Sequence, residues 1–460
     1  MLAIAGRMRN DHDDPTDRRR WHTAVRLILL ATLLLVAILA GRGTFTGTDF
    51  DKWHTDWSTL EACLPEGGCG ALTKFPVAYL LNAGIVTAVS SWTSPPIVLW
   101  LVNVAALLLP ILLAFALRLS SALDRAIVYA LGLVLSPIPA FYLWSGALEF
   151  QSGILTGLWV VLAARRLDAD SAEGRRGEGW VLAGVSFLMP LYKDTVVVLF
   201  VIGGGAALLA VAIASRSLEQ LPRQLWVGLM RLRFTLIAPL AAAVLVPVAY
   251  NVLRYGSPLP LAYMGESDLT SPPFAVSQWF LIGSVFSPNG GIVVFWALGF
   301  AAVIGCLRVL GARLHGPAVT VAVGYAAVSL LAFAQWWAPF GWTSWGNRLM
   351  VPPMVCLLVV TVFSARQASG GAVARSSPAR SPWRIAMAGV VLAAAGLSAN
   401  YVAASYFMDN ALHRSLMETG PACNKLESLL AKDIDMRLWR TTRYYACVRE
   451  RFLYVPAAWR

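Results

Sequence analysis

The chain of 460 residues contains little charge. Asp, Glu, Lys and Arg make up 13% of it, whereas a soluble domain of this length contains about a quarter of such residues. Hydrophobic residues reach 58%, the mean hydropathy is +0.63, and the apolar runs are too long for the core helices of a soluble protein. The scarcity of charge therefore predicts an all-α membrane protein with many spans.

Other signals are missing as well. We find no soluble domain of any size, no tandem repeat and no glycine loop of the Walker type. Acidic residues number 25 against 37 basic ones, which gives a net charge of +12. Such a balance can indicate nucleic-acid binding, but the arginines cluster between apolar runs, as they do in the cytoplasmic loops of membrane proteins. We therefore expect membrane lipids as the surroundings and no nucleic acid as a partner.

The apolar segments predict a bundle of about 11 transmembrane helices. Several segments are shorter than the roughly 20 residues that cross hydrocarbon, so we expect broken or tilted helices where 126–146 meets 150–165 and where 180–192 meets 195–215. The first segment follows three arginines and imitates a signal peptide, but we interpret it as an uncleaved span. The predicted spans are 24–41, 96–117, 126–146, 150–165, 180–192, 195–215, 234–253, 291–308, 317–335, 349–365 and 385–404.

Arginines divide the loops into two sets. With the N-terminus inside, alternate loops are rich in arginine, and this bias predicts a plasma (inner) membrane protein with a cytoplasmic N-terminus. The predicted parts are a cytoplasmic segment 1–23, a polytopic domain 24–408 with a first outer loop 42–95, and an extracytoplasmic tail 409–460. The tail is basic and departs from the charge rule, so its position depends on the odd number of spans. The loops of the other set contain only Arg42, Lys52, Lys74, Lys193, Arg254 and Arg348.

Four of the six cysteines fall in pairs within predicted outer segments. Cys63 and Cys69 lie in the first outer loop, and Cys423 and Cys447 lie in the tail. Two cysteines in one exported segment suggest the disulfides Cys63–Cys69 and Cys423–Cys447, with four free thiols as the alternative. The other two cysteines, Cys306 and Cys356, fall inside spans and are expected to be small buried hydrophobic residues.

A carboxylate pair lies immediately beyond the first span. Asp49 and Asp51 occur in TGTDFDKWHTDW, with Asp56 close behind. Carboxylates at the membrane boundary can take a proton from an acceptor hydroxyl; a solvated acidic loop is the alternative. Lys74 follows before a stretch, 77–92, that is expected to lie along the membrane.

Charged residues also occur in four later outer loops. Glu149 and Gln151 lie in a loop so short that they must sit near the hydrocarbon boundary, where a carboxylate indicates either function or pairing. Lys193 suits an anionic headgroup, or it bridges to Asp194 or Glu149. Arg254 and Arg348 can bind phosphate bidentately.

Aromatic residues accompany these cations. Indole and phenol rings can stack on sugar rings, although an aromatic belt with snorkelling arginines is the alternative. With phosphate-binding cations and proton-accepting carboxylates, they predict a site for an anionic lipid-linked sugar. The aromatic candidates are Tyr255, Tyr263, Trp337, Trp342 and Trp345.

The order of these motifs resembles the GT-C superfamily, the polytopic glycosyltransferases that use polyprenyl-phosphate sugars. The resemblance covers about residues 24–365. It departs in the first loop, where Asp-Phe-Asp stands in place of Asp-Glu or a lone Asp. The motifs that resemble it are Asp49-Phe50-Asp51, Lys74-Phe75-Pro76, Arg254-Tyr255-Gly256-Ser257-Pro258, Phe286-Ser287-Pro288-Asn289-Gly290-Gly291, and Trp345-Gly346-Asn347-Arg348 with Pro352-Pro353.

The resemblance implies a GT-C-like bundle with interfacial helices in its outer loops and a short C-terminal tail. It implies inverting transfer of a sugar from a polyprenyl-phosphate donor to an envelope glycan, lipid or protein acceptor. Asp49 is then the first choice for general base and Asp51 the second. Lys193, Arg254 and Arg348 bind the donor phosphate, and the substrate contacts are Lys74, Glu149, Gln151, Tyr255, Tyr263, Trp337, Trp342 and Trp345.

No cofactor is required by this logic, although Asp49, Asp51, Asp56 and Glu149 could bind a divalent cation through oxygen. Two other functions are compatible with the sequence. One is a transporter or flippase for a lipid-linked sugar, and the other is a non-catalytic subunit of the same architecture.

Overall fold

The computed structural model describes part of the chain, and nearly all of that part is helical, which confirms the all-α class. The described residues also contain one antiparallel pair of short strands, β1 (Ala312–Arg313) and β2 (Arg366–Gln367). The described residues are 15–39, 58–59, 62–63, 77–89, 92, 94–119, 121–139, 142–144, 148–168, 176–192, 194–215, 219, 221–259, 274–286, 291–335 and 347–367.

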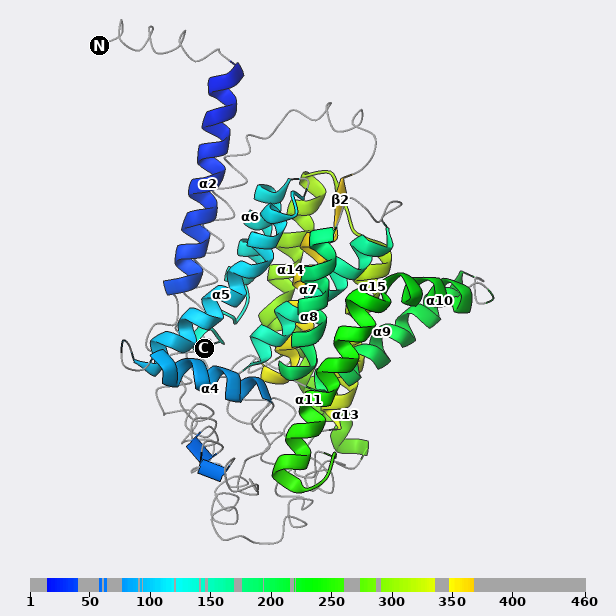
Figure 1. Cartoon of the computed structure of the whole chain (residues 1–460). Coiled ribbons are helices and arrows are strands. Elements are labelled where there is room, and N and C mark those ends of the chain that lie inside the picture. Colours follow the sequence, from blue (N-terminus) through cyan, green and yellow to red (C-terminus); the bar gives the residue numbers. More distant parts are fainter. Residues whose placement is uncertain are drawn as a thin grey trace, which may run out of the picture.

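Figure 1 shows the helices in chain order. They are α2 (Pro15–Leu39), α4 (Val77–Val89), α5 (Pro95–Ala116), α6 (Ala122–Val134), η1 (Tyr142–Trp144), α7 (Glu149–Leu167), α8 (Arg176–Tyr192), α9 (Asp194–Ala214), α10 (Leu221–Leu232), the π-helical turn η3 (Arg233–Ile237), α11 (Ala238–Tyr255), α13 (Phe274–Phe286), α14 (Ile292–Val309), α15 (Gly316–Ala334), η4 (Arg348–Met350) and α16 (Val351–Phe363).

Six helical stretches are long and apolar enough to cross a membrane, so the chain is a membrane protein. Ten of the eleven predicted segments overlap a helix, and the eleventh, 385–404, lies outside the described residues. The total of about 11 spans, the domain limits and the tail therefore stay predictions. The six stretches are Trp21–Leu39, Pro96–Ala116, Thr195–Ala214, Trp226–Tyr255, Ile292–Val309 and Gly316–Ala334.

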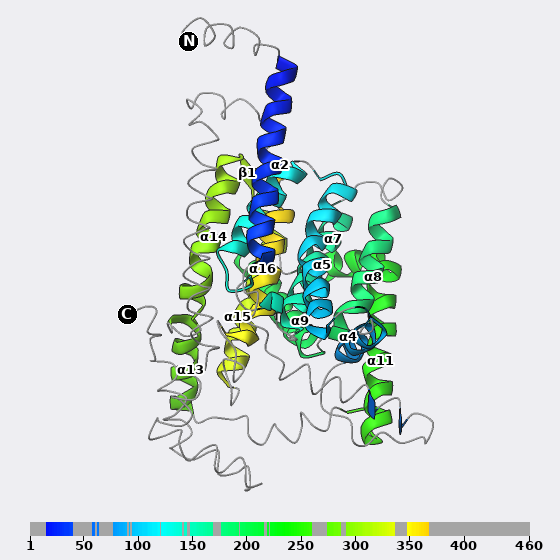
Figure 2. The same cartoon turned by 90° about the vertical axis from the view of Figure 1, so that its left-hand side faces the viewer.

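The helices alternate between two ends of the bundle. Figures 1 and 2 place the start of α2 and the β1–β2 pair toward one end, and α4 with the C-terminus of α11 toward the other. We call the first the arginine-rich end, because Arg125, Arg165 and Arg366 lie there, and the second the α4 end. The alternation agrees with the loop sets that the arginine bias predicts, while the membrane side that each end faces stays a prediction.

The predicted span 126–146 is interrupted within its length, whereas the break was expected where it meets 150–165. Helix α6 stops at Val134, and η1 follows at Tyr142–Trp144. Pro137 and Pro139 lack the amide hydrogen that a continuing helix needs. Ser136 stabilises the break, because its hydroxyl donates to the Leu133 carbonyl at 2.6 Å and accepts from the Ile138 amide at 3.3 Å.

Helices α7 and α16 form the centre of the bundle, and two glycines bring them together. A Cβ added to Gly153 would lie 2.8 Å from the Pro352 carbonyl oxygen, and one added to Gly157 would lie 2.7 Å from the Cβ of Val359. Small residues four apart on one helix allow this close approach. The contact fixes the start of α7 beside the start of α16, which positions the first part of the site.

Candidate functional site

The first part of the site is a buried ion pair at the α4 end. Glu149 begins α7 and Arg348 lies in η4, just before α16. The Nε atom of Arg348 lies 2.9 Å from Oε1 of Glu149, which is only 1% exposed. The structure thus shows the pairing that was one of the two alternatives for Glu149. A carboxylate in the first turn of a helix is also stabilised by the helix dipole.

Gln151, two residues further into α7, belongs to a second polar contact. Its Nε2 donates to Oδ1 of Asn103 at 2.8 Å. The side chain of Asn103 in turn donates to the main-chain carbonyls of Tyr142 and Leu143 at 3.4 and 3.2 Å, which the break after α6 leaves available. Asn103 is not among the predicted site residues. Its signal in the sequence is a single amide within the apolar segment 96–117.

Asn347, next to Arg348, is a further residue that the sequence analysis did not select. It is completely buried and has a left-handed backbone with φ of 59°. Within the described part of the chain, neither its Nδ2 nor its Oδ1 has a hydrogen-bond partner. A buried amide without a partner costs about 1–3 kcal/mol, so this position beside Arg348 suits a polar group from elsewhere in the chain or from a ligand.

Arg254 forms the second part of the site at the C-terminus of α11. It is 6% exposed, and its Nε and Nη2 donate to Oδ1 of Asn251 at 3.2 and 2.7 Å. The centre of its guanidinium lies 4.3 Å from the Tyr250 ring and 4.7 Å from the Tyr255 ring. The rings and the helix C-terminus stabilise the positive charge. Gly256, with φ of 66°, ends the helix immediately after these residues.

Helix α4 contacts both parts. On one side, Leu80 of α4 packs with Tyr250, together with Leu253 of α11 and Cys63 of the first outer loop. On the other side, Ala78, Ala83 and Val86 of α4 belong to one apolar cluster with Leu148, which precedes Glu149. Figure 1 shows α4 lying across the end of the bundle, in keeping with the expected interfacial stretch. One helix of the first outer loop therefore links the surroundings of Glu149 and of Arg254.

The remaining predicted residues lie outside the described residues, and their roles stay predictions. They include both candidate bases and the third cation. The predicted disulfides also stay predictions, since three of the four cysteines are among these positions. The positions are Asp49, Asp51, Asp56, Lys74, Lys193, Tyr263, Trp337, Trp342, Trp345, Cys69, Cys423 and Cys447.

The two cysteines inside predicted spans and the possible metal ligands can also be compared with the predictions. Cys306 and Cys356 are free thiols; Cys356 is buried and Cys306 half-buried, as expected for residues inside spans. Among the described residues, no three His, Cys, Asp or Glu side chains come together as metal ligands. Three members of the possible oxygen site, Asp49, Asp51 and Asp56, lie outside that part of the chain.

Comparison with known proteins gives one similar solved structure. No family model and no curated protein matches the chain. The chain is similar to the crystal structure of ArnT from Cupriavidus metallidurans bound to undecaprenyl phosphate. The identity is 14%, the TM-score is 0.45, and the match covers 96% of this chain and 77% of that chain. ArnT is a GT-C glycosyltransferase, the superfamily that the motif order resembles. At this identity and TM-score we base no functional argument on the likeness.

Proposed function

We propose that the chain is a membrane glycosyltransferase that moves a sugar from a polyprenyl-phosphate donor to an envelope glycan, lipid or protein acceptor. The observation that carries the proposal is the burial of charged side chains at the α4 end. Glu149 and Arg254 are 1% and 6% exposed at the ends of otherwise apolar helices. Ionisable groups within a membrane bundle are costly and mark substrate sites.

The two arginines are suited to bind the donor phosphate. Asn251 and the two tyrosine rings orient the guanidinium of Arg254, and Glu149 orients that of Arg348. A guanidinium held in place before the substrate arrives can pair bidentately with phosphate and stabilise the charge that develops as the lipid phosphate leaves. This leaving group departs as an anion, so no general acid is needed. Lys193, between α8 and α9, is the third proposed cation.

We propose that the general base is a carboxylate of the first outer loop. Asp49 is the first choice and Asp51 the second. A contact supports the approach of this loop to Arg254, since Cys63 of the loop packs in the cluster of Tyr250 and Leu80. The acceptor hydroxyl would lose its proton to the carboxylate and attack the anomeric carbon opposite the phosphate, which inverts that centre. A positioned base contributes about 10²–10⁴-fold to the rate.

The proposed substrate contacts divide by chemistry. Tyr255 already lies against the Arg254 guanidinium, and the network of Gln151 and Asn103 lies beside the ion pair. The others would contact the sugar, the lipid or the acceptor; they are Lys74, Tyr263, Trp337, Trp342 and Trp345.

A transporter for the same lipid-linked sugar fits the described residues less well. Transporters place ionisable groups near the membrane midplane, at breaks in their helices. Here the charged residues of the six membrane-crossing stretches lie at or near their ends, as Arg26, Arg254 and Arg308 do. Charges near the helix ends, and not at the midplane, favour chemistry at a membrane surface over alternating access.

The test is a transfer assay on the purified full chain with a radiolabelled polyprenyl-phosphate sugar. Asp49→Ala and Asp51→Ala are compared with Asp56→Ala, a matched change in the same loop. We expect at least one of the first two variants to lose transfer by about 10²-fold or more, as loss of a base requires, while Asp56→Ala retains it. If both retain transfer, the catalytic role is refuted. Movement of the label across the bilayer without transfer would identify a transporter instead.

A further inference from the structure

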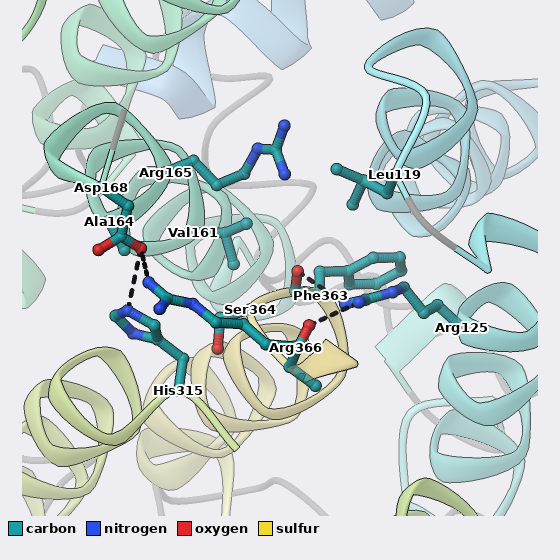
Figure 3. Close-up of a pocket in the computed structure, with 11 residues that line it drawn as sticks. Leu119, Arg125, Val161, Ala164, Arg165, Asp168, His315, Phe363, Ser364 and Arg366 are labelled. Carbon is teal, nitrogen blue, oxygen red and sulfur yellow. Dashed lines mark hydrogen bonds and ion pairs between the residues drawn. The ribbon is translucent and has the colours of Figure 1, made fainter. Parts of the chain in front are cut away.

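A second polar cluster lies at the arginine-rich end, away from the proposed site. The ends of α6, α7, α15 and α16 surround a cavity of about 450 Å³ there. Figure 3 shows its polar lining. The polar lining is Ser364 together with five ionisable side chains from separate parts of the chain, which are Arg125, Arg165, Asp168, His315 and Arg366.

The lining contains more positive than negative charge. Asp168 is its single carboxylate, and Oδ2 of Asp168 contacts both Arg366 and Nε2 of His315, the latter at 3.1 Å. Nδ1 of His315 accepts a hydrogen bond from the Ala318 amide at 3.2 Å, which directs Nε2 toward Asp168. Three guanidinium groups therefore face one carboxylate.

Arg125 is held rigidly in the wall. Its Nη1 donates to the carbonyls of Val362 and Phe363 at 3.0 and 3.1 Å, and its Nη2 donates to the Ala365 carbonyl at 2.5 Å. These carbonyls end α16, where a cation is favoured by the helix dipole. Arg125 itself is 6% exposed.

Arg165 reaches the cavity from the opposite side. Figure 3 shows the side chains of Arg165 and Arg125 extending toward the space between α7 and α6. Nη2 of Arg165 lies 2.6 Å from Oε1 of Glu178 in α8, which fixes its direction. Glu178 offsets part of the charge of Arg165, and an anion between the guanidinium groups of Arg165 and Arg125 would lower the repulsion that remains. The rest of the wall is apolar and includes Leu119, Val161 and Phe363.

We propose that this cavity binds a phosphate ester. Planar guanidinium groups match phosphate oxygens bidentately, and the apolar wall suits the carbon part next to the phosphate. The ligand is either the headgroup of an anionic phospholipid in the leaflet at this end or a soluble phosphate compound. This site is separate from the proposed sugar-transfer site, so each can be refuted without the other.

The experiment uses the purified full chain and two probes. One probe is inorganic phosphate, titrated in an uncharged detergent while the melting temperature is followed. The other is a bilayer disc of phosphatidylcholine with or without phosphatidylglycerol, for which the bound anionic lipid is measured by mass spectrometry after extraction. The variants are Arg165→Gln and Arg366→Gln, and the control is Arg308→Gln, an exposed arginine at the same end that does not line the cavity.

We expect at least one probe to bind both cavity variants about tenfold more weakly than the wild type, in line with the loss of one charged hydrogen-bonded pair. The same probe should bind Arg308→Gln as well as it binds the wild type. Binding of inorganic phosphate identifies a soluble ligand, and retention of phosphatidylglycerol alone identifies a lipid headgroup. Either supports the proposal. It is overturned if neither probe binds the wild type, or if Arg308→Gln weakens binding as much as the cavity variants. The Arg366 side chain is 56% exposed, so that variant keeps the test valid if Arg165→Gln fails to fold.

Discussion

Arg348 and Glu149, far apart in the sequence, form an ion pair with 2.9 Å between Nε and Oε1. Their helices, α16 and α7, pack along two glycines of α7, and the pair lies where that contact reaches the α4 end. The carboxylate is almost fully buried. The pair therefore holds Arg348 in one orientation toward the proposed donor phosphate.

Removing the carboxylate should cost stability as well as activity. In Glu149→Gln, Arg348, whose side chain is 20% exposed, keeps its charge without the buried carboxylate. Breaking a fully buried pair costs about 3–5 kcal/mol, and we expect a smaller loss here. We expect a lower free energy of unfolding in detergent. The double variant Glu149→Gln with Arg348→Met should recover part of the stability and none of the transfer activity. The single variant Arg348→Met completes the comparison. If the stability lost in the double variant equals the sum of the losses in the two single variants, the two side chains are not coupled.

Arg254→Lys tests whether donor binding needs the planar shape of the Arg254 guanidinium or only its positive charge. Lysine keeps the positive charge but loses the planar fork and the stacking between Tyr250 and Tyr255. We expect KM for the polyprenyl-phosphate donor to rise about tenfold, the effect of losing one charge-assisted hydrogen bond. Steady-state kinetics measure this, with Arg308→Lys as the matched control. Unchanged donor KM in Arg254→Lys would remove Arg254 from the donor site.

The amide network makes a separate prediction. Asn103→Leu removes the acceptor of Gln151 and the donor to the carbonyls of Tyr142 and Leu143. Buried polar groups left without partners cost about 1–3 kcal/mol. The melting temperature should therefore fall, whereas Thr32→Val, which removes an exposed hydroxyl from α2, should leave it nearly unchanged. Equal melting temperatures for wild type and Asn103→Leu would show that the network contributes nothing.

Glycines at the crossing of α9 and α15 allow a test of packing. A Cβ added to Gly324 would lie 2.3 Å from the carbonyl oxygen of Gly203, so Gly324→Ala forces the helices apart at a cost of about 1–3 kcal/mol. Gly205 lies on α9 with open space around it, and Gly205→Ala should be neutral or slightly stabilising. Thermal unfolding of both variants measures the difference. A melting temperature for Gly324→Ala at or above that of Gly205→Ala would contradict the close crossing.

Much of the fold follows from the sequence because apolar length and arginine position are local properties. Segment 317–335 was predicted, for example, and α15 occupies Gly316–Ala334. The end of α6 at Val134 was missed, although Pro137 and Pro139 are a local signal for it. Partners across the bundle do not follow, because packing determines them. Glu149 could be assigned to function or pairing, but its partner could not be identified. Asn103 gained its role only from tertiary contacts, and Asn347 only from its burial.

Helix α4 touches the neighbours of both Glu149 and Arg254. A shift of this one element would move both walls of the proposed donor site in step. Entry of a long isoprenoid chain and alignment of its charged end would then both depend on the position of α4. A substitution on α4 far from any reacting atom would then slow turnover while every direct contact to the substrate is kept.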